Sequence, residues 1–281
     1  MIKLLRKIFR IRLIDKLNKH LNNPYWDLFI AKYYEDCQYK HPNPLNHFGH
    51  KCFSQADEDG ITLEIIKRLN ISKGTYAEFG VADGLENNTL ILASLGWKGF
   101  WVSGGNLAFN YSNAKNFKYI QAWITKDNIS DLTQTGLNFL NIGQVDVASL
   151  DLDGNDYYFI ESLLENNFKP KLFIVEYNSK FPPGIHFKIK YNERHIWKGD
   201  DYLGASITSF VELFSRFNYS LICCNSHTGV NAFFIQNEFL YLFKDIPKDI
   251  SNIYVPPRYY VYNKYGHKLS SQLVEDIINN A

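Results

Sequence analysis

TYAEFGVADGLENNTLILASLGWKGFWVSG (75–104) is the stretch of sequence that decides the fold. Residues 75–80 have a strand-like pattern, and Gly80 and Gly84 allow a tight turn whose backbone can lie close to a ligand. Residues 85–96 are typical of a helix, and 99–103 form a second apolar, strand-like run. This order predicts neighbouring strands of a parallel sheet.

The same alternation continues toward the C-terminus. Residues 226–230 are too short for a helical crossover, so the last two strands must pair antiparallel as a hairpin. We therefore predict an α/β fold with a mostly parallel seven-stranded sheet that ends in an antiparallel hairpin. The further predicted strands are 116–125, 146–153, 171–178, 219–225 and 231–238, and the predicted helices are 155–167 and 205–218.

Three regions are expected along the chain. Residues 1–50 form a helical N-terminal extension that ends in HPNPLNHFGH (41–50), residues 51–240 form the α/β domain, and residues 241–281 form a C-terminal tail or lid. The domain opens with SQADEDGITLEIIKRL (54–69), in which Ser54 is a suitable N-cap and apolar residues recur at helical spacing.

The first twenty residues are basic and apolar, and arginines interrupt any signal-peptide core. A helix here would either lie on an anionic membrane surface or pack on its own domain or on a partner subunit. The aromatic C-terminus is open to three interpretations: a pocket lid, a dimer edge or a nucleic-acid contact. The basic residues near the N-terminus are Lys3, Arg6, Lys7, Arg10, Arg12, Lys16 and Lys19, against a single acid, Asp15.

Composition excludes several classes. The chain has 281 residues, 46% hydrophobic and 16% aromatic, which exclude disorder for most of it. A net charge of +1 gives no bulk attraction to nucleic acid. No apolar run is long enough for a spanning helix. The cysteines lack CxxC spacing, so reduced thiols of a cytoplasmic protein are the simpler interpretation.

In open α/β sheets, ligands bind beyond the carboxyl ends of the strands. Glu78 and Asp83 flank the first predicted turn, and their negative charge suits a cationic or amino-bearing ligand better than a pyrophosphate. The turn also lacks the three-glycine dinucleotide fingerprint, so S-adenosylmethionine is favoured over NAD. The alternative is a turn without a ligand.

The second constellation is SLDLDGND (149–156). Asp151 and Asp153 would share one face of the strand end, where they could hold a proton or a divalent cation. Glu176 and Asn178 would project beside them if their strands are neighbours. Capping and turn roles are the alternative for these residues.

A long irregular segment, 179–206, follows the fifth strand. Its aromatic and acidic residues suit a sugar, because rings stack on the apolar face and carboxylates accept hydroxyl protons. His186 or His195 could act as a general base. The predicted substrate-binding residues are Glu176, Asn178, Tyr191, Asp201, Tyr202 and Asn231.

These motifs resemble class I S-adenosylmethionine-dependent methyltransferases with a Rossmann-like fold, and most closely the FkbM-like enzymes of bacterial surface-polysaccharide loci. The resemblance covers roughly residues 50–240. It implies that Glu78, Gly80, Asp83 and Gly84 hold the methionine part of the cofactor, with Asp151 and Asp153 at the methyl-transfer end. The matching segments are 53–61, 77–89, 96–102, 149–158, 174–183, 200–206 and 228–234.

One departure from that family lies at the end of the second strand. The acid that normally accepts both ribose hydroxyls is missing, and the chain has Ser103-Gly104-Gly105-Asn106 there. Such a carboxylate contributes about 1.5–3 kcal/mol. Ser103 and Asn106 replace it only in part, which weakens cofactor binding roughly ten- to a hundred-fold.

The sequence thus predicts methyl transfer from S-adenosylmethionine to a hydroxyl of a sugar or nucleotide-linked sugar, with Asp151, Asp153 or His186 as proton acceptor. We expect no nucleic-acid partner, a cytoplasmic location with peripheral contact to the inner membrane surface through residues 1–20, and a homodimer as one possible assembly. Two alternatives remain: a non-catalytic protein on the same fold, and a Mg-dependent phosphatase-type hydrolase with Asp151 as nucleophile and Asp200-Asp201 as metal ligands.

Overall fold

The computed structural model describes residues 24–258 and 270–280. The chain separates into two compact units, residues 1–40 and 41–281. In the first unit the described part is one helix, α2 (Pro24–Tyr39). The basic segment 1–20 and most of the aromatic C-terminal stretch lie outside the described residues. No helix of the described part is long and apolar enough to span a membrane.

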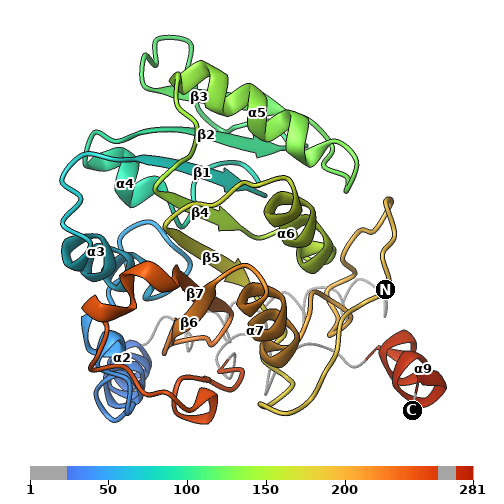
Figure 1. The fold of residues 1–281 in the computed structure, drawn as a ribbon. Helices are drawn as coiled ribbons and strands as arrows, with labels where there is room; N and C mark the ends of the chain where they lie inside the picture. Colours follow the sequence, from blue (N-terminus) through green and yellow to red (C-terminus); the bar gives the residue numbers. More distant parts are fainter. Residues whose placement is uncertain (1–23, 259–269, 281) are drawn as a thin grey trace, which may run out of the picture. The chain divides into compact units, whose positions relative to one another are not determined.

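The second unit is built on a seven-stranded sheet with the order β3-β2-β1-β4-β5-β7-β6 (Figure 1). All neighbouring pairs from β3 to β5 are parallel, and β7 is antiparallel to both β5 and β6. This confirms the predicted Rossmann-like methyltransferase fold, with β7 inserted between β5 and β6. The strands are β1 (Thr75–Phe79), β2 (Lys98–Ser103), β3 (Phe117–Gln121), β4 (Val147–Leu150), β5 (Leu172–Glu176), β6 (Tyr219–Cys224) and β7 (Asn231–Gln236).

Helices connect most of the parallel strands, while an irregular segment joins β2 to β3. In Figure 1, α5, α6 and α7 follow one another along the sheet. Gly136 of α5 lies so close to β2 that an added Cβ would be 2.4 Å from the Phe100 ring. The helices of this unit are η1 (Pro44–Phe48), α3 (Glu58–Arg68), α4 (Leu90–Ser94), α5 (Ile129–Leu140), α6 (Asp156–Glu165), α7 (Ile207–Ser215), η2 (Asn237–Leu242), η3 (Ile250–Asn252) and α9 (Ser271–Asn280).

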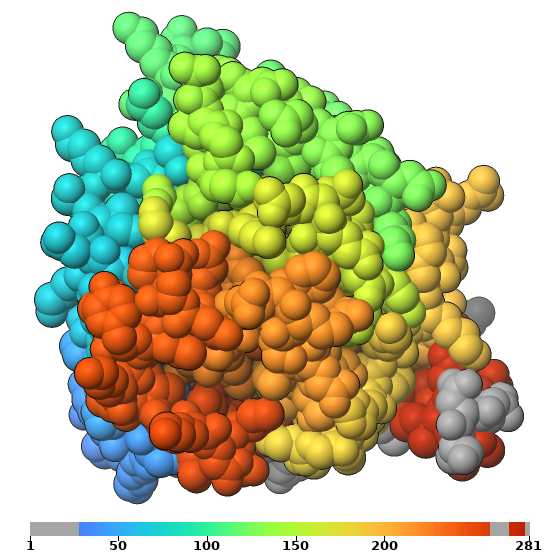
Figure 2. All heavy atoms as spheres, in the orientation of Figure 1, coloured from blue at the N-terminus to red at the C-terminus, as the bar shows by residue number. Residues whose placement is uncertain are grey.

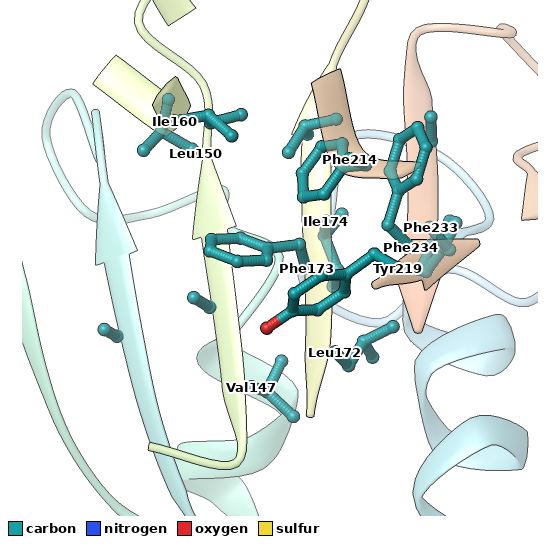
Figure 3. Close-up of a cluster of buried hydrophobic side chains, with 14 of the residues drawn as sticks. Val147, Leu150, Ile160, Leu172, Phe173, Ile174, Phe214, Tyr219, Phe233 and Phe234 are labelled. Atoms are coloured by element: carbon teal, nitrogen blue, oxygen red, sulfur yellow. The ribbon is translucent and has the colours of Figure 1, made fainter. Parts of the chain in front are cut away.

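An aromatic cluster fills the core under β5, β6 and β7 (Figure 3). The Phe173 ring lies 5.3 Å from Phe214 and 5.6 Å from Tyr219, and Phe214 stacks on Phe234 at 4.0 Å, measured between ring centroids. Each of these side chains is almost fully buried. Burying an aromatic side chain stabilises the fold by roughly 1.5–3 kcal/mol, so this cluster anchors the hairpin end of the sheet.

Three predicted boundaries were wrong, each for a local reason. Helix α3 begins at Glu58, with Asp57 and not Ser54 as N-cap residue. Helix α4 begins only at Leu90, because the N–H groups of the two preceding residues are bonded to the Glu78 carboxylate. Strand β4 ends at Leu150, so Asp151 and Asp153 lie in a turn and not on the strand. Helix α5 was not predicted at all.

Candidate functional site

The turns after β1 and β4 touch each other at the carboxyl edge of the sheet. Gly80 has a φ of +87°, and a Cβ built on it would be 1.7 Å from the backbone oxygen of Asp151. Any side chain at position 80 would therefore push the two turns apart. A ligand bound over Gly80 would therefore lie next to Asp151.

Backbone strain is concentrated in the same two turns. Ala82 has a φ of +44° and Asp153 a φ of +54°. A left-handed conformation costs a non-glycine residue about 1–2 kcal/mol, and such strain clusters at functional sites. The other non-glycine residues with a positive φ in the described part are all asparagines, which tolerate this conformation. They are Asn70, Asn141, Asn167 and Asn218.

Glu78 is buried, and protein donors already occupy its carboxylate. Oε1 accepts the N–H of Asn88 at 2.9 Å, while Oε2 accepts the N–H and the hydroxyl of Thr89 at 2.9 and 2.5 Å. Burial raises the pKa of Glu78, and these hydrogen bonds partly offset that rise. Glu78 thus shapes the loop that follows the turn instead of facing outward to a cofactor.

Asp83 and Gly84 complete the turn. The Asp83 side chain is exposed, with Oδ1 accepting the N–H of Leu85 at 3.1 Å. Gly84 has a φ of +81°, and an added Cβ would be 2.8 Å from Leu107 and 2.9 Å from Phe109. Asp83 is therefore the acid of the turn that a ligand can reach.

The end of β2 lies where the sequence placed it. Ser103 is its last residue and is buried, and the Asn106 amide oxygen accepts a hydrogen bond from Gln121 at 3.0 Å. A Cβ on Gly105 would be 3.2 Å from the backbone oxygen of Ala82. The loops after β1 and β2 therefore approach each other closely at Gly105, and Asn106 has a partner within the protein.

Three carboxylates meet beside the Gly80 turn. Asp151, Asp153 and Glu176 each present an oxygen, and these oxygens lie within 4.8 Å of one another. Leu150 is paired with Val175, so the next residues, Asp151 and Glu176, leave adjacent strands at the same level. Register alone brings these two acids together, and the strained turn adds Asp153.

Burial raises the pKa values of Asp151 and Glu176 well above their ordinary range, and the charges of the neighbouring carboxylates add to that rise. The two side chains share a hydrogen bond. Oε2 of Glu176 is buried without a hydrogen-bond partner among the described residues. Two buried carboxylates this close repel each other when both are charged, so a shared proton or a bound cation stabilises the pair.

Asp156 holds the turn beneath this cluster. Its carboxylate accepts the N–H groups of Leu152 and Gly154, both at 2.8 Å. Burial raises the pKa of Asp156 to about 6, although these two hydrogen bonds oppose the rise. Asp156 is also the first residue of α6, so its charge lies at the N-terminus of that helix.

His195 lies against the same turn, while His186 does not. A Cβ on Gly154 would be 2.2 Å from Cδ2 of His195, so the imidazole rests on the glycine backbone. Burial lowers the pKa of His195, partly offset by the backbone of Asp153, and its Nε2 is a buried atom without a partner among the described residues. His186 is exposed and its Nδ1 lies 3.3 Å from Glu212.

Asn178 and Asp201 are buried and hold the long segment in place. The Asn178 amide donates to the carbonyls of Asp201 and Leu203 at 3.0 and 3.1 Å. The Asp201 carboxylate pairs with Lys180 and accepts the N–H of Ser270 at 2.8 Å. Both residues are thus engaged within the protein and lie outside the carboxylate group of Asp151.

Tyr191 and Tyr202 line a cavity of about 790 Å³ between residues 190–202 and the start of α9. The Tyr202 hydroxyl donates to Asp276 at 2.8 Å, and the Tyr191 hydroxyl accepts the N–H of Lys126 at 2.9 Å. His195 belongs to the lining as well. This one histidine therefore connects the cavity with the turn that carries the carboxylates.

Sequence reasoning missed a buried acid network that joins α3 to the β6–β7 hairpin. Oε1 of Glu58 accepts the amide groups of Asn225 and Asn231 at 2.9 and 3.0 Å, and Oε2 accepts the N–H of Ala56 at 2.8 Å. Burial, followed by the charge of Asp57, raises the pKa of Glu58 to about 7. Asn231, predicted to bind substrate, contacts this network.

No protein-family profile and no curated protein matches the sequence. Several solved structures have a similar fold. One is a 1,6-didemethyltoxoflavin N1-methyltransferase of Burkholderia thailandensis, solved with S-adenosylhomocysteine. It gives a TM-score of 0.38 at 10% identity and covers 62% of this chain and 74% of that one. A proposed hemolysin of Lactococcus lactis gives a TM-score of 0.39 at 11% identity over 66% of this chain and 90% of that one. A family 2 O-methyltransferase of Planctomyces limnophilus, in complex with apigenin, gives 0.34 at 8% identity over 58% and 51%. These likenesses are distant, and the fold assignment rests on the strand order.

Proposed function

We propose that the protein transfers a methyl group from S-adenosylmethionine to a hydroxyl of a sugar or nucleotide-linked sugar. The main support for this proposal is the contact between Gly80 and Asp151. It places the glycine turn after β1 directly beside the carboxylate cluster. S-adenosylmethionine supplies a methyl group on a positively charged sulfur. Close placement of donor and acceptor accounts for much of the rate in such reactions.

The residues of the β1 turn fit this cofactor. Gly80 and Gly84 leave the backbone bare, and the exposed carboxylate of Asp83 matches an amino group. Glu78 would act as a positioning residue through Asn88 and Thr89. Ser103 would be the remaining polar group near the ribose.

The Asp151–Glu176 pair is the proposed proton acceptor. A carboxylate that shares one proton with its neighbour can still accept a proton from a hydroxyl. Asp153, with Asp151 and Glu176, also offers the oxygen ligands that Mg²⁺ or Mn²⁺ prefers, and the unpartnered Oε2 of Glu176 fits a cation. His195 replaces His186 as the histidine near this cluster.

The biological role, location and assembly of the protein are also part of this proposal. An FkbM-like role in surface-polysaccharide synthesis agrees with a sugar acceptor, and a cytoplasmic location agrees with the expected reduced cysteines. Cys37, Cys52, Cys223 and Cys224 are all unpaired. Contact of residues 1–20 with the inner membrane surface, and a homodimer, belong to the same proposal. Loss of liposome binding in a chain lacking residues 1–20 would support the membrane contact.

Calorimetry with S-adenosylmethionine tests the proposed function. We expect sub-millimolar binding by the full chain and its loss in Asp83→Ala, with Glu165→Ala on the surface of α6 as the matched control. Unchanged affinity in a folded Asp83→Ala variant would place the cofactor elsewhere.

A non-catalytic protein on this fold is the second candidate. The narrow gap between Gly105 and Ala82, together with the missing ribose acid, favours it. Absence of S-adenosylmethionine binding, even with candidate acceptors present, would support this alternative. The hydrolase alternative loses its support, because Asp201 is paired with Lys180 and lies outside the Asp151 group.

A further inference from the structure

We propose that the cavity beside α9 binds a phosphate group of the acceptor, so that the acceptor is a phosphorylated or nucleotide-linked sugar and not a neutral one. The identification of this ligand as the methyl acceptor rests on the proposed function. The phosphate site itself rests on the residues that line the cavity.

Cations dominate the charged residues of this cavity. Its lining includes Lys190, Arg194 and Lys198, against Asp200 as the acid. Lys190 is fixed in the wall, since its ammonium lies 2.6 Å from the Asp276 carboxylate. Within the described part of the chain, Arg194 and Lys198 form no salt bridge, so the lining keeps an excess of positive charge despite Asp200.

One histidine links the cations of this cavity to the turn that carries the carboxylate cluster. His195 stands between Arg194 and Lys198 in sequence and touches Gly154, the neighbour of Asp153. A cavity with an excess of cations that one histidine joins to a carboxylate cluster suits a ligand with an anionic part and a neutral hydroxyl part.

The rest of the lining fits phosphate oxygens. Ser270 and Ser271 contribute hydroxyl groups, and Ser271 is the first residue of α9. An arginine fork and hydroxyl donors match the several oxygens of a phosphate. Figure 2 shows the yellow to gold segment beside the red α9, and the Lys190–Asp276 and Tyr202–Asp276 contacts join the two.

A volume of about 790 Å³ lies within the range of small-molecule sites and exceeds the need of a single phosphate. Tyr191 and Tyr202 add aromatic surface against which a sugar ring or a base can pack. The phosphate would then sit at Arg194 and Lys198, with the sugar directed past His195 toward Asp151.

The test is calorimetry on the full chain without S-adenosylmethionine. The probes are glucose 1-phosphate, uridine monophosphate, UDP-glucose and neutral methyl α-glucoside. We expect at least one phosphorylated probe to bind, and the double variant Arg194→Ala/Lys198→Ala to weaken that binding by about ten-fold or more. The exposed Lys244→Ala is the matched control and should bind as the unaltered protein does.

Binding of uridine monophosphate alone would assign the phosphate to a nucleotide, and binding of glucose 1-phosphate alone to a sugar phosphate; both outcomes support the site. Failure of every phosphorylated probe at millimolar concentration, or equal binding by a folded double variant, overturns it. Because S-adenosylmethionine binding is measured separately, loss of the methyltransferase proposal and loss of the phosphate site are distinguishable.

Discussion

The imidazole of His195 lies directly on the backbone of Gly154, so that a Cβ at position 154 would be 2.2 Å from its Cδ2 atom. This contact joins two segments that are far apart in the sequence. It also partly buries the ring, and burial lowers the pKa of His195. The glycine thereby fixes where the histidine lies and contributes to the burial that lowers its pKa.

Gly154→Ala should displace His195 without straining the backbone, because Gly154 is not among the residues with positive φ. We expect the pKa of His195 to rise toward its ordinary value of 6.5, methyl transfer to fall about ten-fold, and stability to fall by about 1–3 kcal/mol from overpacking. An NMR titration of the imidazole, compared with that of His186, checks the shift. An unchanged His195 titration would contradict the contact.

Ser103→Asp should tighten S-adenosylmethionine binding by about ten-fold, since a carboxylate at the end of β2 can accept hydrogen bonds from ribose hydroxyls. Ser103 is buried, so the same change should lower the melting temperature of the ligand-free protein. Ser103→Asn is the matched control without the charge. Equal affinities in all three proteins would mean that the ribose does not reach β2.

Mg²⁺ or Mn²⁺ should raise the melting temperature through Asp151, Asp153 and Glu176, because a bound cation stabilises only the folded state. At a hundred times the dissociation constant the gain is about 2.7 kcal/mol. Glu176→Gln should abolish this gain, while Glu238→Gln on the surface should keep it. A cation effect that survives Glu176→Gln would place the ion at another site.

The contribution of Glu58 to the stability of the fold should fall as pH rises from 5 to 8. Glu58 titrates at 4.5 when unfolded and at about 7 when folded, so between these values the folded state holds a proton that the unfolded state lacks. The contribution of Glu58 is therefore complete below 4.5 and is lost through pH 7, on the order of 3 kcal/mol. Asp156, raised to about 6, acts in the same direction.

The variant Glu58→Gln measures how much of the pH dependence of stability comes from Glu58. The Gln amide would meet the N–H of Ala56 where Oε2 now accepts it, so the variant should be about 1–3 kcal/mol less stable at pH 5. The deficit should narrow by pH 8, because the amide carries no charge to bury. Denaturant unfolding across this pH range measures both, and a deficit independent of pH would exclude a titrating Glu58.

The sequence by itself determined the order of the seven strands and of the helices between them except α5, because apolar periodicity and turn residues are local properties. It determined the hairpin of β6 and β7 from the shortness of residues 226–230, and the end of β2 at Ser103. It also indicated that Asp151 and Glu176 would meet, since adjacent parallel strands end at one edge.

Only the tertiary structure decided which polar groups are already satisfied. Glu78 and Asn178 are residue types that often bind ligands and lie at strand ends, yet both side chains are hydrogen-bonded within the protein. A hydrogen bond between distant segments leaves no pattern in the sequence of either segment alone. The choice of His195 over His186 likewise depended on how a long irregular segment folds back on Gly154. Burial is a property of the whole packed chain, and burial sets the pKa values on which the proposed chemistry depends.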